Sequence, residues 1–207
     1  MMIMIVVCAL IAYLLGSINT SILVSRAMGA GDIRKSGSGN AGATNTLRTL
    51  GKKAALFVVL GDALKGIAAI VIARLITSDD MGALPEYAAA LFVVLGHNFP
   101  LYFGFKGGKG ILTSLFVILM LDWRIGLIVA VISVAVIALS KYVSLGSMTG
   151  SALFPLLVLA FHWGNWWFAG LAVIMGALAI YMHRTNIKRL INGTESKLSV
   201  GKKSGGQ

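Results

Sequence analysis

The stretch that decides the fold is Ile3–Val24, IMIVVCALIAYLLGSINTSILV, which holds no charged residue. At a rise of about 1.5 Å per residue, a helix of this length crosses a hydrocarbon core about 30 Å thick. No basic residue precedes the apolar run, so we interpret it as a retained first membrane helix and not as a cleaved signal. The chain is therefore expected to enter a membrane with its first element.

Six further apolar segments follow this first one. They are Ala54–Ile76, Leu84–Phe103, Ile111–Leu121, Ile125–Leu139, Met148–Phe161 and Trp166–Met182. Together the segments predict an all-α integral membrane protein with about seven transmembrane helices, built as a single membrane-embedded domain over residues 1–207 with a flexible tail over 198–207. The segment at 84–103 is expected to span in full, whereas the one at 111–121 is short for a bilayer.

Composition and charge support a membrane protein. The mean hydropathy is +0.88 and 12% of the residues are charged, where a soluble domain has about 25%. The net charge of +11 does not indicate nucleic-acid binding, because too little chain lies outside the apolar segments to build such a domain. The three histidines and the single cysteine lack metal-ligand spacing, so we expect no metal and no cofactor.

The distribution of lysine and arginine predicts the orientation. Of the 18 cations, 15 fall in the first, third and fifth loops and in the C-terminal segment. Cytoplasmic loops carry an excess of Lys and Arg. The N-terminus is therefore expected outside and the C-terminus in the cytoplasm, with the polar motifs on the cytoplasmic side.

The first polar motif is Ser38–Arg48, SGNAGATNTLR. Asn40 or Ser38 can cap a short helix over about residues 41–49, which would aim free N–H groups at an anion. Arg48 would add a bidentate contact, and Asn40 and Asn45 are further candidates for substrate binding. The alternative is a mobile, positively charged loop that only obeys the charge rule.

The second motif runs from Gly96 to Gly110. Its glycines let backbone N–H groups turn toward phosphate, and its lysines supply opposite charge. No Walker spacing is present, so nucleotide hydrolysis is not expected; a flexible turn with lysines at the headgroups is the alternative. The candidate substrate-binding residues are His97, Lys106, Gly107, Gly108, Lys109 and Gly110.

The third motif is the polar segment after the last apolar run. If the last helix continues, His183 and Asn186 share a face at i, i+3. A histidine where a helix leaves the membrane, such as His183, is either a catalytic residue or an anchor at the membrane interface. Glu195 is expected to pair with a neighbouring cation.

Two weaker pairs complete the candidates. Asp62 and Lys65 lie at i, i+3 inside a span, where charges are usually paired, so we interpret them as structural. Ser144 and Ser147 would either donate hydrogen bonds to a substrate or cap the next helix. The tryptophans at 163, 166 and 167, next to His162, are typical of an outer aromatic belt.

These three motifs, in this order and in a hydrophobic chain of this length, resemble the bacterial acyl-phosphate:glycerol-3-phosphate acyltransferase family, often called PlsY. The resemblance covers essentially the whole chain. It implies a seven-helix membrane bundle with its site on the cytoplasmic side of the bacterial inner membrane. The implied reaction is transfer of a fatty acyl group from acyl phosphate to the sn-1 hydroxyl of glycerol 3-phosphate, giving lysophosphatidic acid and inorganic phosphate.

For this reaction we expect Ser38, Arg48 and His183 to be catalytic, with Asn186 and His183 binding glycerol 3-phosphate. The proton acceptor is either His183 or a phosphate oxygen of a substrate. The expected partners are acyl phosphate, glycerol 3-phosphate and membrane lipid, with no nucleic acid and no obligate protein partner. An organophosphate transporter is the alternative function, although Asp62 and Lys65 are the only clear polar candidates within a span.

Overall fold

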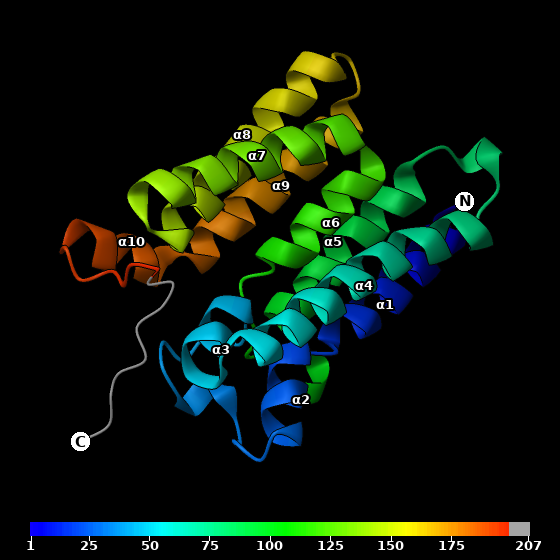
Figure 1. Ribbon diagram of the computed structural model, residues 1–207. Helices are drawn as coiled ribbons and strands as arrows, with labels where there is room; N and C mark the ends of the chain where they lie inside the picture. Colours follow the sequence, from blue (N-terminus) through cyan, green and yellow to red (C-terminus); the bar gives the residue numbers. More distant parts are fainter. Residues whose placement is uncertain (199–207) are drawn as a thin grey trace, which may run out of the picture.

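The computed structural model describes residues 1–198, and every regular element within them is a helix (Figure 1). The long helices are α1 (Met2–Ser17), α4 (Lys52–Ile76), α5 (Leu84–Asn98), α6 (Ile111–Leu121), α7 (Trp123–Ser140), α8 (Val143–Phe161) and α9 (Trp166–Met182). The short ones are α2 (Thr20–Ala27), α3 (Ala43–Leu50) and α10 (Arg184–Ile191), with 3-10 turns at Ile33–Lys35, Asp79–Met81 and Leu101–Phe103. Each predicted apolar segment is thus helical over most of its length.

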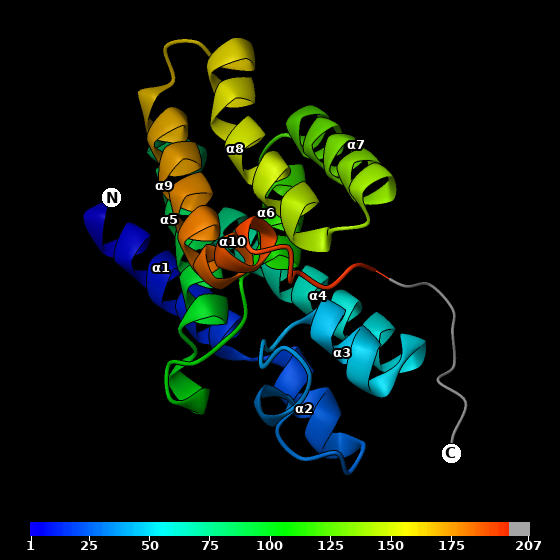
Figure 2. The ribbon, with the colours of Figure 1, turned by 90° about the vertical axis from the view of Figure 1, so that its left-hand side faces the viewer.

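The helices pack as two groups around one apolar core. α1 lies along α5, and α4 packs against α5 and α6. α7, α8 and α9 form the second group, which joins the first through α6 against α7 and α5 against α9 (Figures 1 and 2). The side chains buried between the helices are mostly alanine, valine, isoleucine and phenylalanine, with Cys8, Leu171 and Met175 among them.

Small residues allow α1 and α5 to approach closely. A Cβ on Gly16 would overlap the carbonyl of Val93, and a Cβ on Gly96 would overlap the carbonyl of Tyr13. Such small-residue contacts are typical of membrane helix pairs, where backbone approach provides the van der Waals packing. The close contact places the end of α5, and the motif that follows it, against the end of α1.

Four helical stretches are long and apolar enough to cross a membrane, or five if the bent pair α9–α10 counts as one. The expected full-length helix over residues 84–103 was wrong in its extent: α5 ends at Asn98 after 15 residues. Pro100 follows two positions later, and the position before a proline disfavours helical backbone. The structure therefore shows an all-helical membrane protein, while the number of crossings stays a prediction.

The first apolar stretch is also broken. α1 ends at Ser17, and the side chain of Asn19 accepts a hydrogen bond from the N–H of Ile22 to cap α2. The break leaves the Ile18 carbonyl without a helical partner, and Lys65 Nζ donates to it at 3.1 Å. A polar interaction therefore interrupts a segment whose composition alone indicates one helix.

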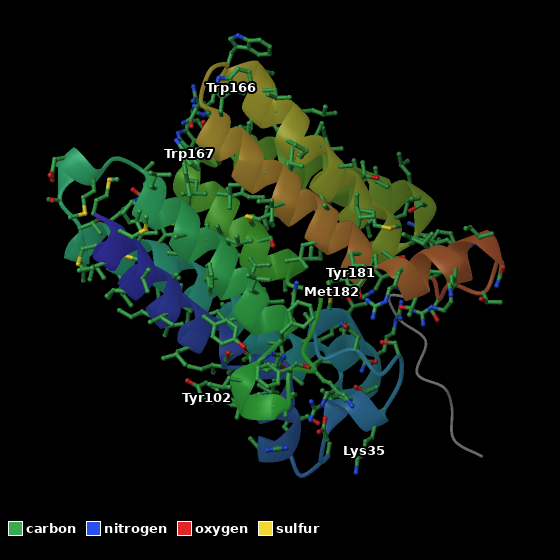
Figure 3. All side chains as sticks on the ribbon, turned by 180° about the vertical axis from the view of Figure 1, so that it is seen from behind. Lys35, Tyr102, Trp166, Trp167, Tyr181 and Met182 are labelled. Carbon is green, nitrogen blue, oxygen red and sulfur yellow. The ribbon has the colours of Figure 1, made fainter. Side chains whose placement is uncertain are left out.

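The two ends of the molecule differ in chemistry. Figure 3 shows Trp166 and Trp167 at one end and Lys35 at the other. α2 and α3 lie at the Lys35 end (Figures 1 and 2).

The predicted tail lies outside the described residues except for Leu198, whose N–H donates to the Lys141 carbonyl at 2.7 Å.

Candidate active site

The three polar motifs converge on one cavity of about 440 Å³. Its lining has a polar part, here called the mouth, and an apolar part, here called the interior. From the predicted site residues the mouth takes Ser38, Asn40, Asn45, Arg48, Asp62, His97, Lys109, Gly110, Ser144, Ser147, His183, Asn186 and Glu195. The interior is lined by side chains of α6–α9 such as Ile118, Val129, Phe154 and Met175. One cavity therefore offers both charged and hydrocarbon-compatible walls.

Asn45 folds the first loop. Its Oδ1 accepts from the N–H of Ser38 at 2.8 Å, and its Nδ2 donates to the carbonyls of Ile33 and Ser36. The expected cap by Asn40 or Ser38 was wrong, because α3 begins after Gly42 with no side-chain cap. Among residues 1–198, the hydrogen bonds of the Asn45 amide all go to the loop backbone, so they hold the loop in its fold.

Ser38 and Arg48 reach the cavity from the two ends of this motif. Arg48 Nη2 donates to the Ser196 carbonyl at 3.0 Å, and within residues 1–198 most of its five N–H donors have no other partner and can bind an anion. The first loop is therefore ordered by its own hydrogen bonds and by α3, and it presents a guanidinium at the mouth.

The glycine-rich loop after α5 is held by backbone contacts. The N–H groups of Gly107 and Gly108 donate to the carbonyls of Asn98 and His97. These two amides are thus not available to phosphate, contrary to the sequence-based expectation. A Cβ on Gly108 would overlap the Ala41 carbonyl and His97 Nε2, so only glycine fits between the two motifs.

Lysines 106 and 109 differ in position. Lys106 is exposed and lies outside the cavity lining, and its carbonyl accepts from Arg34. Its expected role in binding phosphate is not supported. Lys109 lines the cavity together with Gly110, the residue that precedes α6. First-turn amides of a helix have no partner within it and favour anions, so Lys109 and the start of α6 form the cationic wall.

Glu195 organises the third motif. Its carboxylate accepts hydrogen bonds from Ser144 Oγ and Asn186 Nδ2, both at 2.7 Å, and from Arg189 Nε at 2.8 Å. Burial raises the pKa of Glu195, but these hydrogen bonds outweigh it and hold the pKa below its usual range. The expected pairing with a cation is confirmed. Asn186 Oδ1 in turn accepts from Lys109 Nζ, which links the second and third motifs.

His183 lies at a bend of 56° between α9 and α10, so the last helix does not continue straight as expected. His183 and Asn186 nevertheless both line the cavity. His183 Nδ1 lies 2.8 Å from the Ala179 carbonyl. A carbonyl can only accept, so Nδ1 carries the proton in the neutral ring and Nε2 keeps a lone pair.

The remaining candidates have local partners. Ser147 donates to the Val143 carbonyl. Lys65 Nζ lies 2.9 Å from Asp62 Oδ1 with both side chains buried, as the structural interpretation expects.

Sequence reasoning missed Arg189, which lines the cavity and lies three residues after Asn186 on α10. Within residues 1–198, no cluster of His, Cys, Asp and Glu could hold a metal ion.

Comparison with known proteins places this geometry among related chains. Residues 6–193 match the family model described as glycerol-3-phosphate acyltransferase. A relative of that name from Thermoanaerobacter pseudethanolicus is 48% identical over 93% of this chain and 95% of its own. One from Clostridioides difficile is 46% identical with the same shares.

Two solved structures share the fold. The crystal structure of PlsY, an integral membrane glycerol 3-phosphate acyltransferase, in its glycerol 3-phosphate form is 36% identical with a TM-score of 0.87. It covers 94% of this chain and 96% of the other. The lysophosphatidic acid form gives 35% identity and a TM-score of 0.84, over 94% and 95%.

Proposed function

Since this chain belongs to the glycerol-3-phosphate acyltransferase family, and thus to the enzymes of phospholipid biosynthesis, we propose that it takes its acyl group from acyl phosphate. The acceptor is the sn-1 hydroxyl of glycerol 3-phosphate, and the products are lysophosphatidic acid and inorganic phosphate. Solved forms of the related PlsY with glycerol 3-phosphate and with lysophosphatidic acid support the acceptor and the product.

The observation that carries this proposal is the joining of a cationic mouth to an apolar interior in one cavity. Each substrate bears about −1.5 to −2 charges near neutral pH, by analogy with phosphomonoesters. Bringing the two together costs several kcal/mol at an effective dielectric near 20. Arg48, Lys109 and Arg189 offset this repulsion, while the interior accepts the hydrocarbon chain of the donor.

The reaction needs little from the protein beyond alignment of the two substrates, because acyl phosphate is an activated donor with phosphate as leaving group. The hydroxyl must meet the acyl carbonyl in attack geometry, and developing charge must be stabilised. Ser38 at the mouth is placed to hydrogen-bond near the reacting atoms. A catalytic metal or cofactor forms no part of the proposal.

His183 is suited to accept the proton of the attacking hydroxyl. Its Nδ1–H is held by the Ala179 carbonyl, which directs the basic Nε2 lone pair away from α9. The alternative is a phosphate oxygen of a substrate. His183→Gln separates the two: a large loss of kcat with little change in KM for glycerol 3-phosphate supports His183 as the base.

In the membrane we propose a single domain with about seven crossings, the N-terminus outside and the cavity mouth facing the cytoplasm of the bacterial inner membrane. The clustering of 15 of 18 cations in the first, third and fifth loops and the C-terminal segment supports this orientation.

The identity of the acyl donor tests the proposed function. Purified protein is given labelled glycerol 3-phosphate with palmitoyl phosphate and, in separate reactions, with palmitoyl-CoA or palmitoyl-acyl carrier protein. We expect sn-1 lysophosphatidic acid with palmitoyl phosphate alone. Equal turnover with palmitoyl-CoA, or the sn-2 isomer as first product, contradicts it. Arg48→Ala should weaken turnover severely while the protein still inserts, and Lys188→Ala, at an exposed position, is the matched charge control.

A further inference from the structure

A buried charged cluster lies directly behind the glycine-rich loop. It consists of Asp62 and Lys65 on α4 and His97 near the end of α5, which are 2%, 6% and 3% exposed. Intramembrane charges are costly and mark function more often than packing. Asp62 and His97 also line the cavity, so the cluster is not confined to the helix core.

The hydrogen bonds of Lys65 determine the protonation of its neighbour. An ammonium has three N–H donors and no acceptor. Lys65 Nζ has three neighbours at hydrogen-bond distance: His97 Nδ1 at 2.8 Å, Asp62 Oδ1 at 2.9 Å and the Ile18 carbonyl at 3.1 Å. The Asp62 carboxylate at 2.9 Å favours the charged form of Lys65, and with that ammonium the donors and acceptors match only if Nδ1 of His97 accepts. That nitrogen therefore carries no proton.

The opposite arrangement does not fit. A proton on Nδ1 would point at the ammonium 2.8 Å away, and its one acceptor among the described residues would be Asp62 Oδ1 at 3.5 Å, the outer limit for a hydrogen bond. A doubly protonated ring fails for the same reason. His97 is thus a neutral imidazole whose proton sits on Nε2.

This Nε2–H faces the glycine-rich loop. A Cβ on Gly108 would overlap Nε2, which places that nitrogen against the loop. Among residues 1–198, the polar partners of the His97 ring all lie at Nδ1, and none lies at Nε2. His97 lines the same cavity as Lys109 and Gly110. A donor with a fixed direction thus stands beside the cationic wall.

We propose that Lys65, held by Asp62, fixes His97 as a neutral Nε2–H donor that hydrogen-bonds a phosphate oxygen of a substrate in the cavity. Asp62 and Lys65 are positioning residues, and His97 contacts substrate. The inference rests on the proposed function for the identity of the phosphate ligand, while the tautomer itself does not depend on it. The two histidines then offer different groups to one cavity. His97 offers a hydrogen-bond donor, its Nε2–H, and His183 offers an acceptor, its unprotonated Nε2.

Nitrogen NMR of the imidazoles tests the tautomer without any reaction. The chain has only three histidines, and loss of one set of signals in His97→Gln assigns that residue. Near neutral pH we expect a protonated Nε2 and a bare Nδ1, with the Nε2 signal shifting when inorganic phosphate or glycerol 3-phosphate is added. A proton on Nδ1, a charged ring, or signals that neither ligand moves would overturn the proposal.

Two replacements of His97 test the donor by activity. The amide of glutamine can place an N–H near the position of Nε2, whereas that of asparagine reaches only the position of Nδ1. We expect His97→Asn to lose roughly ten- to hundredfold in kcat/KM, the range for a hydrogen bond to a charged group, and His97→Gln to lose less. The substrate whose KM rises identifies the phosphate. Equal losses in both variants contradict a donor role.

The positioning pair is tested with both charges removed together, because one alone would be left buried and unpaired. In Asp62→Leu/Lys65→Met we expect the NMR signals to report mixed tautomers and kcat/KM to fall roughly tenfold or more. Adding His97→Asn should cause little further loss, since both changes remove one interaction. Two results would overturn the proposal and leave Asp62 and Lys65 a structural role only. One is that the losses in kcat/KM from Asp62→Leu/Lys65→Met and from His97→Asn are fully additive, and the other is that His97 keeps a single tautomer in Asp62→Leu/Lys65→Met. Lys53→Met, on the exposed start of α4, is the control.

Discussion

At the scale of single residues, Lys109 carries a charge that its surroundings disfavour. Burial lowers its pKa to about 8; Glu195 opposes the shift, while Arg189 and Arg48 add to it. The substrate phosphates keep their charge above neutral pH. The ammonium form persists below this pKa and is lost above it, so we expect kcat/KM to fall as pH rises through about 8.

Lys109→Arg separates this titration from others in the cavity. A guanidinium stays charged throughout the accessible range, so the alkaline fall should disappear or move to higher pH, measured as kcat/KM against pH with both substrates. Lys188→Arg, at an exposed position on α10, should leave the profile unchanged. An alkaline limb that is the same in Lys109→Arg and in the unmodified protein assigns the titration to another group.

Gly108 is a residue where one methyl group should matter. Its backbone is not in the left-handed region, so the cost of alanine is purely steric: the Cβ would overlap the Ala41 carbonyl and the His97 ring. The loop must then move away from the first motif, and a displacement of about 1 Å can cost about a hundredfold in rate. We expect Gly108→Ala to lower kcat/KM by that order while the protein remains folded, as measured by gel filtration and melting.

At the scale of helices, the contact of α1 with α5 should control both stability and the site. Gly96→Ala would place a Cβ against the Tyr13 carbonyl and force the two helices apart. Overpacking costs about 1–3 kcal/mol, or on the order of 2–12 °C in Tm for a chain of this size. Activity should fall as well, because His97 is the next residue.

Gly170→Ala on α9 is the matched control, since among the described residues its added Cβ meets no atom within 4 Å beyond its chain neighbours and its own helix backbone. Thermal melting in one detergent compares the two variants, and Gly170→Ala should match the unmodified protein or exceed it slightly through higher helix propensity. Equal melting temperatures for the two variants would show that the pair α1–α5 tolerates separation.

The helices were predictable from the sequence because long apolar runs in a membrane leave few other structures. The details of the site were not, because they depend on contacts between distant segments. Lys106 and Lys109 are alike in the motif, yet only the path of the loop past His97 and Ala41 turns the second one into the cavity.

Asn45 and the break after Ser17 show the same limit. The Asn45 amide satisfies three backbone groups of a loop that has no periodic pattern. The break is stabilised by Lys65, 47 positions from the Ile18 carbonyl that it contacts. Local propensity carries no information on either contact, whereas the family resemblance pointed to the right residue types without their geometry.

At the scale of the whole molecule, the separation of tryptophans from cations makes orientation testable. Trp166 and Lys35 are exposed at opposite ends (Figure 3). Cys8, the only cysteine, is 2% exposed, so Cys8→Ala gives a background with no thiol. In that background a cysteine placed at 35 or at 166 reports which end faces the cytoplasm.

We expect a membrane-impermeant maleimide to label Trp166→Cys in intact spheroplasts and Lys35→Cys only in inverted vesicles. The charge distribution predicts this result, because the end that carries Lys35 also carries the first loop and its six cations. Both positions should react after the membrane is dissolved in detergent, which controls for accessibility. Labelling of Lys35→Cys in intact spheroplasts would reverse the orientation and contradict the proposal that the cavity mouth faces the cytoplasm.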